Sequence, residues 1–263
     1  MTILQTRSGR GKPILLVHGL GGSRRSWDAI SPTLAQTKQV IVLELPGHGE
    51  APSEADSGTF EGLARSLDDW IIQENLTGID MVGSSMGARL VLEMARRGHA
   101  GAVVALDPGG FWQGWERTFF RTTITASIAL VRALQPALPA LARNRASRTA
   151  LMLQLSARPW ALDPGLVLNE LQSFAGTPTF NSLVKDLATG PMQEGPAATD
   201  APVVIGWGRK DRLCLPQQAS RARAAFPEAT LHWFEQSGHF PMWDQPEEAI
   251  RVILDATDGT ASG

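Results

Sequence analysis

Short apolar runs alternate along the chain with longer segments in which apolar residues recur every three or four positions. The short runs are apolar at nearly every position, as in strands that are buried on both faces of a parallel sheet. The longer segments have the period of a helix with one buried face. The predicted strands are residues 13–17, 40–43, 79–83, 103–106, 203–207 and 230–234.

This alternation predicts an α/β protein with a mostly parallel sheet and helices on both of its faces. Two of the predicted helices, residues 59–75 and 86–97, have the clearest helical pattern. In sheets of this kind, ligands bind beyond the carboxyl ends of the strands. The candidate functional residues are therefore those that directly follow a predicted strand.

One interval does not fit the alternation. The strands that end at Leu106 and begin at Val203 are separated by about 95 residues, which is too long for one crossover. The middle of this interval has helical periodicity, and prolines divide it into short pieces. We predict a helical cap, residues 109–198, inserted into a core formed by residues 1–108 and 199–263.

The predicted cap is rich in arginine. Residues 111–160 contain seven Arg and one acidic residue, Glu116. Basic helices can bind membranes or anionic partners, but Arg on a solvated helix face is commoner. We therefore expect no stable membrane insertion.

The rest of the composition is that of an ordinary soluble globular protein. Of the 263 residues, 43% are hydrophobic and 19% are charged, and the net charge of −2 does not indicate a nucleic-acid partner. Residues 1–12 lack the apolar core of a signal peptide, and no segment approaches the ~20 apolar residues of a membrane span. The single cysteine, Cys214, fits a reducing compartment and is typical of core packing rather than of a nucleophile. We expect a cytoplasmic monomer or homodimer.

The turn between the strand that ends at Gly83 and the helix that begins at Met86 carries the most specific chemistry. It reads Gly83-Ser84-Ser85-Met86-Gly87. A serine on a sharp turn from strand to helix has an exposed hydroxyl, and small flanking residues let the strand and the helix pack closely. We predict that Ser85 is a nucleophile.

A serine nucleophile needs a base, and the base needs an anion that orients it. Among the five histidines, His239 directly follows the last predicted strand, between a glycine and Phe240-Pro241, as in an exposed loop. Asp211 follows the preceding strand, so the chain order is Ser85, Asp211, His239, as expected in this architecture. Asp107 also ends a strand and is the alternative acid.

An acyl-transfer site also needs donors for the oxyanion of the tetrahedral intermediate. We predict that one donor is the backbone N–H of Met86, directly after the nucleophile, and that the second is the N–H of Leu20 in the loop His18-Gly19-Leu20-Gly21-Gly22. The alternative function of that loop is phosphate binding. It lacks both G-x-G-x-x-G and a Lys-Ser/Thr pair, which argues against that alternative.

Together these motifs resemble the α/β-hydrolase family: H-G-L-G-G at His18, E-L-P-G-H-G at Glu44, G-S-S-M-G at Gly83, G-R-K-D at Gly208 and G-H-F-P-M-W-D-Q-P at Gly238. The resemblance covers the whole chain except the cap. It implies an eight-stranded, mostly parallel sheet, a Ser-His-Asp triad, and neither a cofactor nor a metal. Members with epoxide hydrolase or haloalkane dehalogenase activity have Asp in place of Ser85, so those activities are not expected.

Within the serine branch, the chain looks like carboxylesterases and like hydrolases of carbon–carbon bonds in ring-fission dienoates. The latter usually have an Asn before the nucleophile, where this chain has Ser84. We therefore predict a serine hydrolase of a small or medium carboxylic ester, with a carbon–carbon bond hydrolase or a catalytically weak ligand receptor as alternatives. Phe111, Trp112 and Phe240 lie beside the predicted site in the sequence and are the predicted pocket residues.

Overall fold

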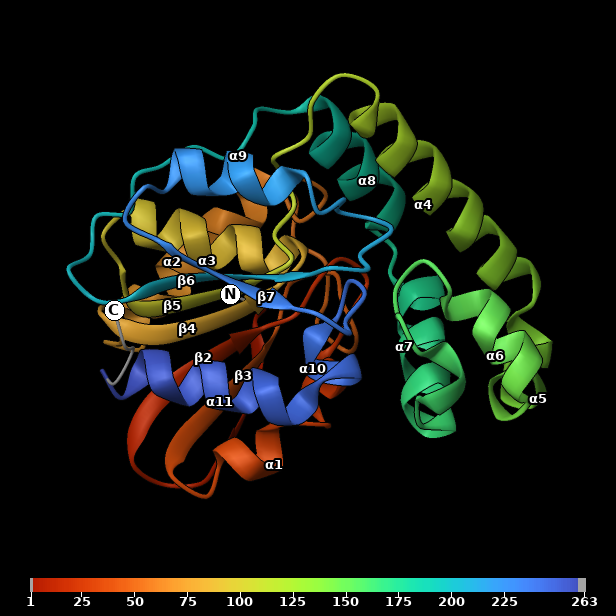
Figure 1. Ribbon diagram of the computed structural model, residues 1–263, viewed down its shortest axis with the longest axis horizontal. Helices are drawn as coiled ribbons and strands as arrows, with labels where there is room; N and C mark the ends of the chain where they lie inside the picture. The colour runs from red at the N-terminus through yellow and green to blue at the C-terminus, as the bar shows by residue number, and fades with distance from the viewer. Residues whose placement is uncertain (1, 260–263) are drawn as a thin grey trace.

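The computed structural model describes residues 2–259, and a seven-stranded sheet forms its centre (Figure 1). The strand order is β1-β3-β2-β4-β5-β6-β7, with every neighbouring pair parallel except β1 and β3. The strands are β1 (Leu4–Ser8), β2 (Lys12–Val17), β3 (Lys38–Glu44), β4 (Ile79–Ser84), β5 (Ala100–Leu106), β6 (Val203–Gly208) and β7 (Thr230–Phe234). The predicted fold class, an α/β protein with a mostly parallel sheet, is confirmed.

The number of strands differs from the eight that the resemblance implies. The chain before β2 contributes the single strand β1, which pairs antiparallel with β3 at the edge of the sheet. Its sequence, Leu-Gln-Thr-Arg-Ser, is polar and its last three residues are exposed. Because an edge strand buries little surface, it lacks the apolar run by which the six other strands were found.

Helices cover both faces of the sheet, as predicted, and each face has its own apolar core. Figure 1 shows α2, α3 and α9 on one face and α1 and α11 on the other. The side chains of β2 alternate between the two cores, with Leu15 in one and Leu16 in the other. The helices outside the insertion are η1 (Arg24–Trp27), α1 (Ser31–Leu34), α2 (Phe60–Gln73), α3 (Met86–Arg96), α9 (Gln218–Ala225), α10 (Pro241–Asp244) and α11 (Pro246–Thr257).

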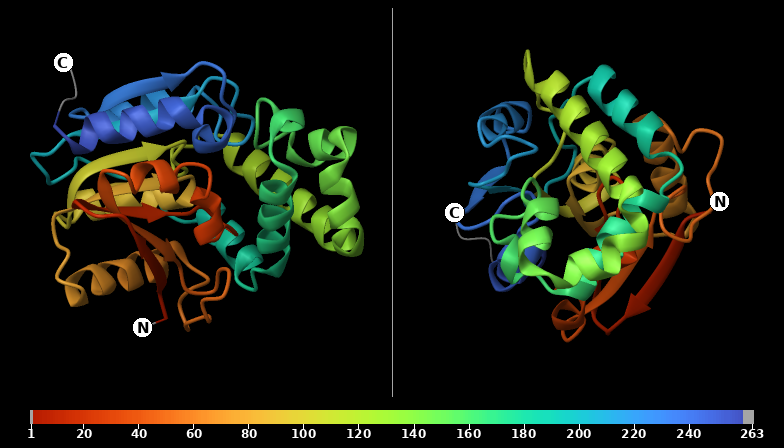
Figure 2. Two further views of the ribbon diagram at one scale, coloured as in Figure 1. Left: turned by 90° about the horizontal axis from the view of Figure 1, so that it is seen from below. Right: turned by 90° about the vertical axis from the view of Figure 1, so that its right-hand side faces the viewer.

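The long interval between β5 and β6 is a group of helices at one end of the sheet (Figure 2). The breaks between these helices coincide with capping residues: the side chain of Asn144 caps α6 and that of Asp163 caps α7. The helices are α4 (Glu116–Ala133), η2 (Gln135–Ala137), α5 (Leu138–Arg143), α6 (Arg145–Met152), η3 (Pro159–Ala161), α7 (Pro164–Gly176) and α8 (Phe180–Thr189). We refer to α4–α8 as the cap.

No single helix within residues 2–259 has both the length and the apolar character to cross a bilayer. Helix α4 and the following segment Gln135–Arg143 meet these criteria only together, and they are bent by 66° relative to each other.

Candidate active site

Ser85 occupies the turn between β4 and α3 in a strained backbone conformation. Its φ of 57° and ψ of −116° lie outside the regions that a side chain normally permits. The conformation is held from both sides, because the N–H of Ser85 donates to the carbonyl of Leu106 (2.9 Å) and its carbonyl accepts from the N–H of Arg89 (3.1 Å). The turn places the Ser85 hydroxyl at the amino terminus of α3 and beyond the carboxyl end of β4.

Two glycines allow this turn to form. A Cβ atom on Gly83 would lie 2.2 Å from the carbonyl oxygen of Gly87, and one on Gly87 would lie 2.2 Å from the carbonyl oxygen of Val17. Both contacts are with backbone that cannot move aside, so α3 can pack directly against β4 and β2 only because these side chains are missing.

Replacement of Gly83 with Ala should therefore destabilise the protein by about 1–3 kcal/mol through overpacking and reduce the activity of Ser85. Urea denaturation with far-UV circular dichroism measures the first effect. Gly176→Ala is a suitable control, because a Cβ atom there would meet nothing within 4 Å. Equal stability of the two variants would contradict the packing argument.

His239 and Asp211 complete a line of hydrogen bonds with Ser85. Nε2 of His239 lies 2.8 Å from Oγ of Ser85, and Nδ1 lies 2.7 Å from Oδ2 of Asp211. The other carboxylate oxygen of Asp211 accepts from the backbone N–H groups of Leu213 (2.7 Å) and Cys214 (3.1 Å). The structure thus brings together the three residues that were predicted as nucleophile, acid and base.

Asp107, the alternative acid, has different partners. Both ring nitrogens of His239 are engaged by Ser85 and Asp211, and Oδ1 of Asp107 accepts from the backbone N–H of Gly208 at 2.8 Å. Burial raises the pKa of Asp107 well above its ordinary value, and the negative charge of Asp211 raises it further. The carboxylate that contacts the imidazole is therefore that of Asp211.

The two predicted oxyanion donors, Leu20 and Met86, lie close to Ser85. Met86 is the first residue of α3, so its N–H has no intrahelical acceptor. Leu20 lies in the loop after β2, where a Cβ on the preceding Gly19 would lie 3.1 Å from Cβ of Ser85. Both Leu20 and Met86 line the same cavity as Ser85.

His18 shapes that loop. Its Nε2 accepts from the N–H of Leu45 (3.1 Å), so Nδ1 carries the proton and donates to the carbonyl of Gly19 (2.8 Å). Complete burial lowers the pKa of His18 to about 4, which keeps the ring neutral at physiological pH. His18 is thus a structural residue.

The cap is joined to the loop that carries His239. The carbonyl of Leu155 accepts from the N–H of His239 (2.9 Å). The buried carboxylate of Asp244 accepts from the N–H of Gly238 (2.7 Å) and also from the hydroxyl of Ser156 (2.5 Å) and the N–H of Ala157 (2.8 Å). These hydrogen bonds connect the segment after α6 to the loop that carries His239.

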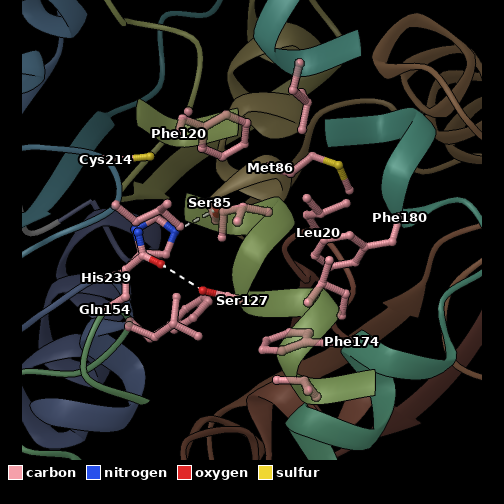
Figure 3. A pocket seen from close by; sticks show the side chains of 18 of the residues that line it. Leu20, Ser85, Met86, Phe120, Ser127, Gln154, Phe174, Phe180, Cys214 and His239 are labelled. Carbon is pink, nitrogen blue, oxygen red and sulfur yellow. Dashed lines mark hydrogen bonds between the residues drawn. The ribbon is translucent and has the colours of Figure 1, made fainter. Parts of the chain in front are cut away.

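A largely apolar cavity extends from Ser85 beneath the cap (Figure 3). Figure 3 shows His239 on one side of the view and Phe174 and Phe180 on the other. The apolar lining residues are Leu20, Met86, Trp112, Phe120, Ile124, Ile128, Val131, Leu151, Leu155, Leu171, Phe174, Phe180, Leu187, Leu213 and Phe240. Polar groups come from Ser85, Arg89, Ser127, Gln154, Cys214 and His239.

Of the three predicted pocket residues, Trp112 and Phe240 line this cavity. Phe111 does not. It is buried in the core with its ring edge-on to Phe226, 6.4 Å between centroids. The carbonyl of Phe111 also accepts from Nε of Arg221 on α9 (2.6 Å), which holds this residue against α9 and away from the cavity.

Sequence reasoning missed most of the cavity wall, which comes from the cap. On α4 the residues Phe120, Ile124, Ile128 and Val131 point inward. Their spacing of three and four marked an apolar helix face, but it did not indicate that this face covers a cavity rather than a core. No sequence motif indicated that Arg89 and Gln154 line the cavity.

Asp211, Cys214 and His239 hold ligand atoms within 4.8 Å of one another, the only such group of metal-ligating side chains in the described part of the chain. Nδ1 of His239 and Oδ2 of Asp211 already bind each other, and burial raises the pKa of the Cys214 thiol well above its ordinary value. These three side chains therefore form a hydrogen-bonded His–Asp pair beside a neutral thiol, which is a poor set of ligands for a metal ion.

Several known proteins are similar to this chain in sequence or in fold. A protein of Mycobacterium tuberculosis described as uncharacterized is 26% identical over 270 residues, which are 96% of this chain and 77% of the relative. The 2-hydroxy-6-oxononadienedioate/2-hydroxy-6-oxononatrienedioate hydrolase of Paraburkholderia xenovorans is 26% identical over 262 residues, 94% of this chain and 88% of the relative.

Among solved structures, a thermophilic esterase from Thermogutta terrifontis superimposes with a TM-score of 0.77 at 20% identity, covering 99% of this chain and 94% of the esterase. At that identity the match shows the fold alone. Residues 14–252 match the model of the alpha/beta hydrolase family, which includes both halves of the core and the cap between them. The chain belongs to the alpha/beta hydrolase family.

Proposed function

We propose that the protein hydrolyses a small or medium carboxylic ester with an apolar acyl group through a covalent acyl-enzyme. The observation that carries this proposal is the continuous line from Asp211 through His239 to Ser85, with distances of 2.7 Å and 2.8 Å. A hydroxyl in this arrangement is activated by an adjacent base whose tautomer is set by a carboxylate.

In the proposed reaction, Oγ of Ser85 attacks the ester carbonyl carbon while its proton passes to Nε2 of His239. The oxygen of the tetrahedral intermediate accepts hydrogen bonds from the N–H groups of Leu20 and Met86. The carbon–oxygen bond then breaks, and His239 gives the proton to the leaving alkoxide. Water attacks the acyl-enzyme, His239 takes a proton from that water and returns it to Ser85, and the carboxylic acid leaves.

The cavity lining supports an apolar substrate. The single cation in the lining is Arg89, and its Nε and Nη2 already donate to Gln193 (3.2 Å) and to the carbonyl of Pro191 (2.8 Å). Its guanidinium also lies over the ring of Phe60. An anionic substrate would thus find few free donors beyond the oxyanion site.

A second candidate is hydrolysis of a carbon–carbon bond, favoured by the relatives that are described as hydrolases of 2-hydroxy-6-oxononadienedioate, at 25–26% identity. That substrate carries two carboxylates, which would have to be held in a cavity whose lining has one cation, Arg89. Together with Ser84 before the nucleophile, this favours the ester.

Hydrolysis of a series of p-nitrophenyl esters beside one ring-fission dienoate, each compared with Ser85→Ala, tests the proposal. We expect ester turnover far above the Ser85→Ala background and slow cleavage of the dienoate. Rapid loss of the yellow dienoate with slow ester hydrolysis would favour the second candidate. If the wild type hydrolyses neither the esters nor the dienoate faster than Ser85→Ala, and binds a small molecule tightly, the protein would be a ligand receptor.

The apolar lining of the cavity predicts a dependence on chain length. Each methylene that enters it contributes up to about 0.8 kcal/mol, so kcat/KM should rise from acetate to hexanoate. Ile124→Trp fills the space beneath α4 and should shift the optimum to shorter esters. The control is Ile72→Trp, at a position that is 52% exposed on α2. An unchanged chain-length profile in Ile124→Trp would show that the acyl group lies elsewhere.

A further inference from the structure

A second carboxyl group lies next to Asp211. Asp107 directly follows β5 and has no exposed surface, in a left-handed backbone conformation with φ of 48°. It reaches this position because β5 and β6 pair in parallel, with Leu106 opposite Gly206, so the loops after the two strands lie side by side. Its N–H donates to the carbonyl of Gly206 at 2.8 Å.

The two oxygens of Asp107 have different surroundings. Oδ1 accepts from the N–H of Gly208, whereas Oδ2 is buried and, within the described residues, receives no N–H or O–H donor. The Asp107 side chain lies beside the Asp211 loop, because the N–H of Gly208 donates to Asp107 and the carbonyl of Gly208 accepts from the N–H of Asp211 (3.2 Å). The negative charge of Asp211 raises the pKa of Asp107, and the Asp211 carboxylate already accepts from His239, Leu213 and Cys214. Two neighbouring carboxylates in a buried site cannot both ionise without a large electrostatic cost.

We propose that Asp107 is a positioning residue that is held protonated and donates a hydrogen bond from Oδ2–H to the carboxylate of Asp211. The proton satisfies an oxygen that otherwise has no donor, and it leaves a single negative charge on the pair. That charge stays on Asp211, because Asp211 receives the N–H groups of Leu213 and Cys214 and faces the imidazole.

The remaining ionisable groups near Asp107 agree with this assignment. Asp211 and the buried Asp244 both disfavour a charge on Asp107, and the nearby Cys214 thiol is neutral. Among these groups, the one cation available is the imidazolium that forms on His239 during the reaction, and it is bound to Asp211. Nothing in this group stabilises a second anion.

Protonation of Asp107 has a consequence for stability that does not depend on any substrate. In the unfolded chain an aspartic acid has a pKa near 3.9, so at neutral pH folding must take up one proton. Stability associated with Asp107 is therefore present below about pH 4 and is lost as the pH rises toward the raised pKa of the folded state.

Asp107→Asn tests this directly. The amide introduced by this substitution can donate to Asp211 and accept from Gly208 without taking up a proton on folding. The variant should therefore not lose stability as the pH rises. Relative to Asp107→Asn, the unfolding equilibrium constant of the wild type should increase about tenfold per pH unit between pH 5 and 7, measured by urea denaturation. If the ratio of the two unfolding equilibrium constants does not change with pH, the proposal is wrong.

A matched control is Asp80→Asn. Asp80 is also buried, on β4, but it pairs with Nζ of Lys12 at 2.7 Å and accepts from the N–H of Ala102. Asp80→Asn should destabilise the protein. The ratio of the unfolding equilibrium constants of the wild type and Asp80→Asn should not increase about tenfold per pH unit between pH 5 and 7.

The positioning role rests on the proposed function and has a kinetic test. Asp107→Ala removes the donor to Asp211 and should lower kcat about tenfold with KM nearly unchanged, whereas Asp107→Asn should restore kcat to within about fivefold of the wild type. A loss of more than 100-fold in Asp107→Asn would show that Asp107 must be ionised. If the wild type hydrolyses no ester, the proposed function fails, and the denaturation series still decides whether Asp107 is protonated.

Discussion

Ser85→Ala should lower kcat for p-nitrophenyl esters by about 10⁶-fold, on the scale found when a serine nucleophile acting as part of a unit is removed. The reason is that Oγ of Ser85 is the proposed attacking atom, and within residues 2–259 it is the hydroxyl that lies within hydrogen-bonding distance of Nε2 of His239. KM should change little, because the loss of one small group leaves the apolar walls of the cavity intact.

Ser84→Ala is the matched control for that variant. Ser84 is the neighbouring residue, fully buried, and its hydroxyl has no hydrogen-bond partner among the described residues. Removal of an unsatisfied buried hydroxyl costs little and can stabilise. Ser84→Ala should therefore retain activity and react with a fluorophosphonate probe, and Ser85→Ala should do neither. Labelling of Ser85→Ala by the probe would place the nucleophile elsewhere.

The sheet could be predicted from sequence because its central strands are buried on both faces. In β2, residues 13–17 are apolar at every position, as is typical of a strand buried on both faces of a parallel sheet. The edge strand β1 has one buried neighbour, so its residues are free to be polar, and no pattern distinguishes it from a loop.

The residues of the candidate site could be predicted because each lies in the turn or loop after a strand and carries chemistry that the site needs. Parallel strands bring their carboxyl ends to one edge, so Ser85, Asp211 and His239 meet there although they are far apart in the chain. The choice between Asp211 and Asp107 could not be made in this way, because both satisfy the same rule. It depends on which carboxylate reaches Nδ1 of His239, a distance of 2.7 Å that only coordinates provide.

The helices of the cap were predicted, but the cavity that they cover was not. Its helices were visible as apolar faces, but an apolar face has the same sequence pattern whether it packs against a core or covers an empty space. Phe111 illustrates the difficulty, because it and Trp112 are adjacent aromatic residues and only Trp112 faces the cavity. Substrate selection depends on this part of the chain, so the acyl group is the least predictable feature of the protein.

Asp211→Asn should lower kcat by about 10⁴-fold, the size of effect known for an isosteric loss of charge at the orienting carboxylate of a serine hydrolase. An asparagine can turn its amide nitrogen toward Nδ1 of His239 and donate to it. The imidazole proton then moves to Nε2, which can no longer accept the proton of Ser85. Binding of the ester to the apolar walls is unaffected, so the loss should appear in kcat.

Comparison with Asp107→Asn makes this test specific, because the same substitution is made in two buried carboxyl groups that adjoin each other. Both variants replace a carboxyl group with an amide. In our proposal, Asp211→Asn removes a negative charge, whereas Asp107→Asn replaces a neutral, protonated carboxyl group with a neutral amide that can donate the same hydrogen bond. Kinetics at pH 7, with unfolding curves to confirm that both variants fold, should give a ratio of kcat values near 10³ or more. Equal losses in both variants would mean that the carboxyl groups share one ionised function, whereas a greater loss in Asp107→Asn would reverse the assignment of the acid.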